Sequence, residues 1–142
     1  MDSQKVKIIL QTNQFGDLEV EEDSIYFFPN GVLGFEDYKN YVLISEENTA
    51  PFKWLISIDE PSIGFPILSP FYLDSEYNIG RNIDLDNNVL FVIITLQDEN
   101  GNISANLKAP LIFNIKQMTG EQLILPFEKY LTNYIITRES KE

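Results

Sequence analysis

Short apolar runs recur along the whole chain, and clusters of Pro, Gly, Asn or Asp such as QDENGN and QMTGEQ separate them. Several of these runs alternate apolar and polar residues, which is the period of a half-buried β-strand. Many short strands with frequent turns predict an all-β fold, either a barrel or a sandwich. The predicted strands lie in KVKIIL, DLEVEED, SIYFF, YVLISE, FKWLISI, IGFPIL, VLFVIITL, ISANL, LIFNIK and QLIL.

The predicted strands and turns leave few residues for helices. One helical turn is expected in GFEDYK and another in SPFYLDSEY. The sequence contains no internal repeat, linker or low-complexity segment, and a length of 142 residues fits one domain with its own core. We therefore expect residues 1–142 to form a single all-β domain with one or two short helical turns.

The first two runs predict a hairpin, because TNQFG between them reads as a turn. With a loop at residues 12–16, the apolar side chains of both strands lie on one face. A shift of one residue would move every side chain to the other face, so the register is a strict prediction. The expected pairs are Leu10 with Leu18, Ile8 with Val20, and Lys7 with Glu21.

The segment FFPNGVLGFEDYK predicts a sharp corner. Pro29 cannot donate to a strand ladder, so the strand before it ends there or lies at an edge. Gly31 can take a positive φ in the PNG turn, and Gly34 frees the chain for another turn. Either Phe35 and Tyr38 close one end of the β-structure, or the corner shapes a surface for a partner. We favour the first role, because large aromatic side chains usually pack in cores.

The sequence offers poor material for catalysis, since it contains no His and no Cys. This removes the usual general base, thiolate nucleophiles, disulfides and the commonest metal ligands. Adjacent acids such as Asp59 and Glu60 point to opposite faces of a strand, so they cannot flank one glycosidic bond. DLDNN at 84–88 lacks the Gly and Glu of a calcium loop, and GVLG lacks the Lys of a phosphate loop. We expect no enzyme, no cofactor and no metal site.

The net charge is -12 and the pI is about 4.3. Direct nucleic-acid binding is not expected, because neutralising phosphates requires clustered Lys and Arg. The acidity is either a solvated surface or a field that speeds encounter with a basic protein partner. The apolar runs in MDSQKVKIIL and in VLFVII at 89–94 are too short for a signal peptide and a membrane span. The expected location is the cytoplasm, without membrane contact.

Three longer segments, taken in this order, resemble one known protein family: FGDLEVEEDSIYFFPNGVLGFEDYKNYVLI, PFKWLISIDEPSIGFPILSPFYL and SANLKAPLIFNIKQMTGEQLIL. Together they resemble the family of the flagellar assembly factor FliW, over about residues 7–125. The family usually reads Gly-Leu-Pro-Gly-Phe-Glu at the corner, whereas Val32 and Leu33 precede Gly34 here. Losing that proline loosens the corner but leaves its glycines.

The resemblance implies a small antiparallel β-barrel-like protein without catalytic activity. Members of this family bind CsrA, a small RNA-binding translational repressor, and relieve its repression of flagellin messenger RNA. They also bind flagellin, and the two partners exchange, so that secretion of flagellin feeds back on its synthesis. The expected partners are therefore CsrA and flagellin.

Candidate partner contacts are polar or aromatic residues at expected strand ends. The alternative for each residue is that its side chain only stabilises a turn or is simply exposed to solvent. The candidate set is Asp59, Glu60, Phe71, Tyr72, Asn106 and Lys108.

A second hypothesis comes from a different class, a small β-barrel ligand- or carbohydrate-binding protein. Trp54 and the Tyr residues would then be stacking platforms. Alternation in FKWLISI places Phe52, Trp54 and Ile56 on one face and Lys53, Leu55 and Ser57 on the other. If the first face is core, Trp54 cannot act as a platform.

Overall fold

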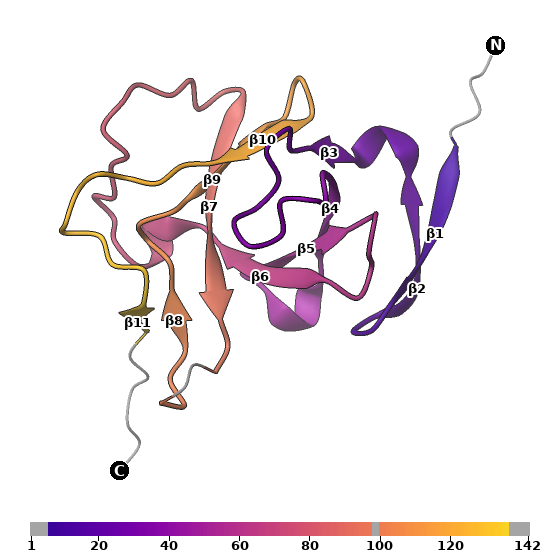
Figure 1. The fold of residues 1–142 in the computed structure, drawn as a ribbon, viewed down its shortest axis with the longest axis horizontal. Helices are drawn as coiled ribbons and strands as arrows, with labels where there is room; N and C mark the ends of the chain where they lie inside the picture. The colour runs from indigo at the N-terminus through magenta and orange to yellow at the C-terminus, as the bar shows by residue number, and fades with distance from the viewer. Residues whose placement is uncertain (1–5, 98–99, 137–142) are drawn as a thin grey trace.

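The computed structural model describes residues 6–97 and 100–136, which form short strands and three 3-10 turns (Figure 1). The strands are β1 (Lys7–Thr12), β2 (Gly16–Glu21), β3 (Tyr26–Phe27), β4 (Asn40–Ser45), β5 (Lys53–Ser57), β6 (Gly64–Leu68), β7 (Asn88–Thr95), β8 (Ser104–Ala105), β9 (Leu111–Asn114), β10 (Thr119–Gln122) and β11 (Tyr134–Ile135). The 3-10 turns are η1 (Glu22–Ser24), η2 (Glu47–Thr49) and η3 (Pro70–Tyr72).

Seven of these strands close into a barrel, in the order β7, β6, β5, β4, β3, β10, β9 and back to β7. Neighbouring strands in this ring are antiparallel, except that β3 and β10 run parallel. β8 pairs with the end of β7, and β11 pairs with β8. The hairpin of β1 and β2 lies beside the barrel, at the right of Figure 1. The predicted all-β, barrel-like fold is confirmed.

Apolar side chains gather in three clusters, one inside the barrel and two outside its wall. β5 borders two of them, because Leu55 points into the barrel whereas Trp54 and Ile56 point toward the hairpin. The alternation predicted for these residues is confirmed. The inner cluster contains Tyr26, Phe28, Val32, Tyr41, Leu55, Ile67, Phe91, Leu111 and Phe113. The hairpin cluster contains Leu10, Val20, Val42, Trp54 and Ile56. The third cluster includes Leu68, Tyr77, Leu90, Val92, Ile94, Leu107, Ile112, Leu125 and Tyr130.

The hairpin has the predicted register. Leu10 lies opposite Leu18, Ile8 opposite Val20, and Lys7 opposite Glu21. The apolar face covers Trp54 and the outer side of β4 and β5, so a one-residue shift would turn the apolar side chains away from this contact. The opposite face is polar, apart from Ile9.

The corner at residues 28–35 closes the barrel core, as favoured from the sequence. β3 ends at Phe27, two residues before Pro29. Gly31 has a φ of 69°, and a β-carbon there would lie 2.7 Å from the Cα of Glu36. The rings of Phe35 and Phe65 meet edge to face at 5.1 Å.

Two local predictions were wrong, and one strand was missed. GFEDYK forms non-helical turns, with a bridge between Val32 and Phe35 in place of a helical turn. QLIL was predicted as a strand, but the strand is β10, inside the segment QMTGEQ that was predicted as a break. β10 tolerates Gly120 because the ring of Phe28 fills the space where a side chain would lie. The short strand β11 was not predicted at all.

Candidate partner-binding surface

Asp59 and Glu60 lie in the turn between β5 and β6. The Asp59 carboxylate accepts hydrogen bonds from the main-chain N–H groups of Lys39 and Asn40, at 3.0 and 3.2 Å. It therefore fixes the start of β4. Glu60 accepts a hydrogen bond of 2.7 Å from the hydroxyl of Ser62. The Glu60 carboxylate, unlike that of Asp59, makes no hydrogen bond with a main-chain group in the described residues.

Phe71 and Tyr72 form the 3-10 turn η3, which starts directly after β6. The hydroxyl of Ser69 accepts a hydrogen bond from the Phe71 N–H and so caps this turn. Phe71 is 44% exposed and Tyr72 66% exposed, and with Ser69 they line a shallow cavity of about 310 Å³. These aromatics are accessible to a partner.

Asn106 and Lys108 lie in the turn after β8. The Asn106 side-chain oxygen accepts hydrogen bonds from the N–H groups of Lys108 and Ala109, so it shapes the turn. The Lys108 ammonium donates to the main-chain oxygen of Phe127 at 3.2 Å. Both side chains are engaged within the fold.

Tyr77 connects η3 with the turn after β8. Its ring lies 6.3 Å from that of Phe71, and its hydroxyl donates a 2.6 Å hydrogen bond to the main-chain oxygen of Leu107. Burial raises the pKa of Tyr77, so this hydroxyl stays protonated and keeps donating. Tyr77 thus joins four of the candidates into one region, which we call the aromatic end: Phe71, Tyr72, Asn106 and Lys108.

The six candidates do not form one surface. β6 runs antiparallel to β5, with Gly64 opposite Ile56 and Ile67 opposite Lys53. Asp59 and Glu60 therefore lie at one end of this strand pair, and the aromatic end begins at the other. A strand of this length separates them by about 17 Å.

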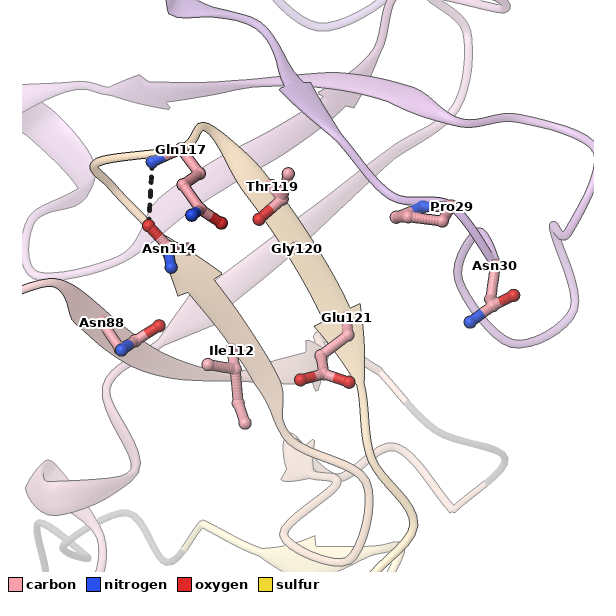
Figure 2. A pocket seen from close by; sticks show the side chains of 9 residues that line it. All are labelled: Pro29, Asn30, Asn88, Ile112, Asn114, Gln117, Thr119, Gly120 and Glu121. Atoms are coloured by element: carbon pink, nitrogen blue, oxygen red, sulfur yellow. Dashed lines mark hydrogen bonds between the residues drawn. The ribbon is translucent and has the colours of Figure 1, made fainter. Parts of the chain in front are cut away.

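A site that sequence reasoning missed lies on the outer barrel wall, and Figure 2 shows it. A cavity of about 370 Å³ opens over β9 and β10, and a second cavity of about 240 Å³ adjoins it. They share Asn88, Ile112 and Glu121, and we call the pair the polar groove. Its larger part is lined by Pro29, Asn30, Asn88, Ile112, Asn114, Gln117, Thr119, Gly120 and Glu121. No sequence motif marks it, because three distant stretches of the chain contribute to it, at 29–30, 81–88 and 112–121.

The family model of the FliW protein matches residues 8–136, which include the barrel, the aromatic end and the polar groove. The chain belongs to the FliW family. The family membership expected from the resemblance is thereby confirmed.

Individual relatives agree with this assignment. The flagellar assembly factor FliW of Alkaliphilus metalliredigens is 33% identical, over 93% of this chain and 88% of its own length. The FliW of Caldanaerobacter subterraneus is 36% identical, over 93% of this chain and 95% of its own length. A crystal structure of a flagellar assembly factor FliW superposes with a TM-score of 0.82 at 30% identity, covering 94% and 99% of the two chains. These relatives are named for flagellar assembly and not for a chemical reaction.

Trp54 does not offer the exposed platform that the carbohydrate-binding hypothesis requires. It is 9% exposed, and its ring meets that of Phe15 edge to face at 5.5 Å. Its indole N–H donates to the hydroxyl of Thr49 at 3.1 Å. Tyr26, Tyr41, Tyr77 and Tyr130 are also buried.

Two further expectations from the sequence concern metal ions and membranes. In DLDNN the Asp84 carboxylate accepts hydrogen bonds from the Asp86 N–H and the Asn87 side chain, which is turn chemistry. Among residues 6–97 and 100–136, no group of three or more acidic side chains is arranged to hold a metal ion. The same described residues include no helix that is long and apolar enough to span a membrane.

Proposed function

We propose that this FliW-family chain is a non-enzymatic regulator that binds CsrA and relieves CsrA repression of flagellin messenger RNA. It also binds flagellin, and the two partners exchange on it, in the cytoplasm where messenger RNA is translated. The observation that carries this proposal is family membership over residues 8–136. The relatives' name, flagellar assembly factor, supports a role in building the flagellum.

The charge of the chain suits a partner whose surface binds RNA. Five acidic residues fall within positions 17–23, on β2 and η1, and the exposed ones include Asp17, Glu19, Glu22 and Asp23. An acidic surface close to bound RNA repels phosphates, but only within a Debye length of about 8 Å at physiological salt. If the contact lies farther from the RNA, relief of repression requires a change in CsrA conformation or dynamics.

The aromatic end is the proposed apolar contact. Phe71 and Tyr72 are exposed aromatics of the type that dominates binding energy at protein interfaces. Asn106 and Lys108 hold the neighbouring turn in shape, and Glu60 supplies a second, acidic contact at the other end of β6. Asp59 is assigned mainly to the fold, because its carboxylate already binds the main chain.

The test is a calorimetric titration of the full chain with purified CsrA and, separately, with purified flagellin. We expect saturable binding of each partner and displacement of CsrA by added flagellin. The variant Phe71→Ala with Tyr72→Ala should weaken at least one of the two by about tenfold or more. The control is Leu85→Ala with Leu96→Ala, which removes two exposed apolar side chains elsewhere. Absence of binding to both partners by the folded wild type would refute the proposal.

A further inference from the structure

A row of side chains in register crosses four strands and passes through the polar groove, with its first residue, Phe27, outside the groove lining. Phe27 on β3 pairs with Thr119 on β10, Thr119 pairs with Asn114 on β9, and Asn114 pairs with Asn88 on β7. Adjacent strands lie about 4.8 Å apart, so the row is about 14 Å long. An extended chain rises about 3.3 Å per residue, so the row matches about four residues of an extended polypeptide.

Several polar side chains in and beside this row have atoms without a partner in the described fold, although the Asn88 NH₂ group donates to the main-chain oxygen of Asp84 at 3.1 Å. Within the described residues, the side chains of Asn30, Gln117 and Thr119 make no hydrogen bond. The Asn114 side chain uses its oxygen to accept from Lys116 and Gln117 N–H groups, which leaves its NH₂ group to donate. Figure 2 shows Asn88, Asn114 and Gln117 reaching over the same stretch of wall. The groove therefore offers both donors and acceptors, as side-chain amides do.

The groove does not suit an anionic ligand. Its guanidinium, Arg81, lies 3.3 Å from the Glu121 carboxylate and is neutralised by it. Asp84 adds a negative charge, so phosphate groups are repelled. None of the nine residues that line the larger cavity is aromatic, so a sugar ring has no stacking platform in it. The unengaged polar groups of the groove, which are side-chain amides and a hydroxyl, suit a ligand with alternating donors and acceptors.

A peptide main chain has this alternation, since each residue presents one N–H and one C=O. We propose that the polar groove binds an extended polypeptide segment, with its amide side chains hydrogen-bonded to the main chain of that segment. Ring closure leaves the strands of this wall paired on both sides, so the segment cannot join the sheet as a further strand. Exposed Phe27 at one end of the row provides an apolar contact for one side chain of the segment.

The proposal is independent of CsrA and flagellin, so it is tested with a phage-displayed library of random short peptides on the immobilised full chain. Enriched peptides are synthesised and titrated against the wild type. They are also made with N-methyl groups on alternate main-chain amides, which removes donors and keeps the side chains. We expect N-methylation to weaken binding by about tenfold or more.

Two variants locate the binding. Gln117→Ala with Thr119→Val removes polar groups of the groove that have no partner within the described fold, and about tenfold or more weaker binding is expected. The matched control is Gln11→Ala with Thr95→Val, which removes the same groups from exposed positions elsewhere. NMR spectra of the wild type offer a test without a variant. The side-chain NH₂ resonances of Asn88, Asn114 and Gln117 should shift when an enriched peptide is added.

Three results would overturn the proposal. The first is failure to enrich any peptide on the folded chain. The second is equal affinity of the groove variant and the wild type, or unshifted groove resonances, which would place the peptides elsewhere. The third is equal affinity of N-methylated and unmodified peptides, which would mean that side chains alone are recognised.

Discussion

The ring of Phe28 lies directly against Gly120, in the space that a β-carbon at position 120 would occupy. Phe28 is fully buried and also meets Tyr41 and Phe113 edge to face, so it has no room to move aside. The closing strand of the barrel, β10, therefore requires glycine at this position.

Gly120→Ala should lower the free energy of unfolding by about 1–3 kcal/mol, because overpacking a filled core forces strain. Denaturant unfolding would measure the loss. The matched control is Gly64→Ala, also within a strand, where the nearest atom to an added β-carbon is the flexible Gln14 side chain at 3.4 Å. Equal stability of Gly120→Ala and the wild type would show that Phe28 can rearrange.

Trp54→Ala should lower the free energy of unfolding by about 3–5 kcal/mol, a large part of the stability of a typical domain. Trp54 fills the space between the barrel and the hairpin, where it packs with Val42, Ile56 and Phe15. The measurement is the thermal unfolding of Trp54→Ala, compared with that of Tyr72→Ala, which removes an exposed aromatic side chain. A variant as stable as the wild type would place Trp54 outside the core.

Asp59→Lys and Glu60→Lys should behave differently, although both are acidic residues in one turn. Asp59→Lys removes the two hydrogen bonds from main-chain N–H groups that hold the start of β4, at a cost of about 1–2 kcal/mol. Glu60→Lys should leave the melting temperature nearly unchanged, because it loses only a contact with Ser62. Separate melting curves decide this, and equal curves would contradict the role given to Asp59.

Tyr41 should make the chain sensitive to alkaline pH. Burial, reinforced by the Asp59 carboxylate, raises the pKa of Tyr41 to about 12. Because the folded pKa lies above the ordinary value of about 10, stability is complete below pH 10 and falls as pH rises from 10 toward 12. Tyr41→Phe should reduce this fall and leave stability at pH 8 equal or higher.

The stability expected for Tyr41→Phe at pH 8 follows from the environment of the Tyr41 hydroxyl. In the described part of the chain, the buried Tyr41 hydroxyl has no hydrogen-bond partner. Removing an unsatisfied buried polar group is neutral or stabilising. Burial also raises the pKa values of Tyr26 and Tyr77, so some alkaline sensitivity should remain in Tyr41→Phe. An unchanged pH profile would show that Tyr41 does not govern it.

The association rate with CsrA should fall as salt concentration rises, while the dissociation rate changes little. The reason is the net charge of -12, which steers a basic partner over long distances without a particular ion pair. Stopped-flow kinetics at several salt concentrations would measure both rates. A salt-independent association rate would refute steering and leave the binding proposal intact.

Much of the barrel was predictable because its signals are local. The hairpin register follows from alternation and from the TNQFG turn, and the end of β3 follows from Pro29. β10 was not predictable, because Thr-Gly-Glu-Gln reads as a turn until Phe28, far away in the sequence, is known to fill the gap at Gly120. Local patterns do not carry that information.

The sites were less predictable than the strands. The candidate residues were chosen as strand-end residues, but Asp59 was already engaged by β4 and Asn106 by its own turn. The polar groove gave no sequence signal, because Thr119, Asn114 and Asn88 become neighbours only through strand pairing. Pairing partners of this kind require the fold.

The parallel contact between β3 and β10 also sets the order in which the barrel can be completed. Phe27 and Thr119 are about 90 residues apart, so the ring stays open until β10 has left the ribosome. Bacterial synthesis at about 5–20 residues per second leaves β3 unpaired on that side for several seconds. The row from Phe27 to Asn88 includes Thr119 of β10, so it forms only after that. A truncated or stalled chain that ends before β10 should therefore expose an unpaired strand edge and lack the polar groove.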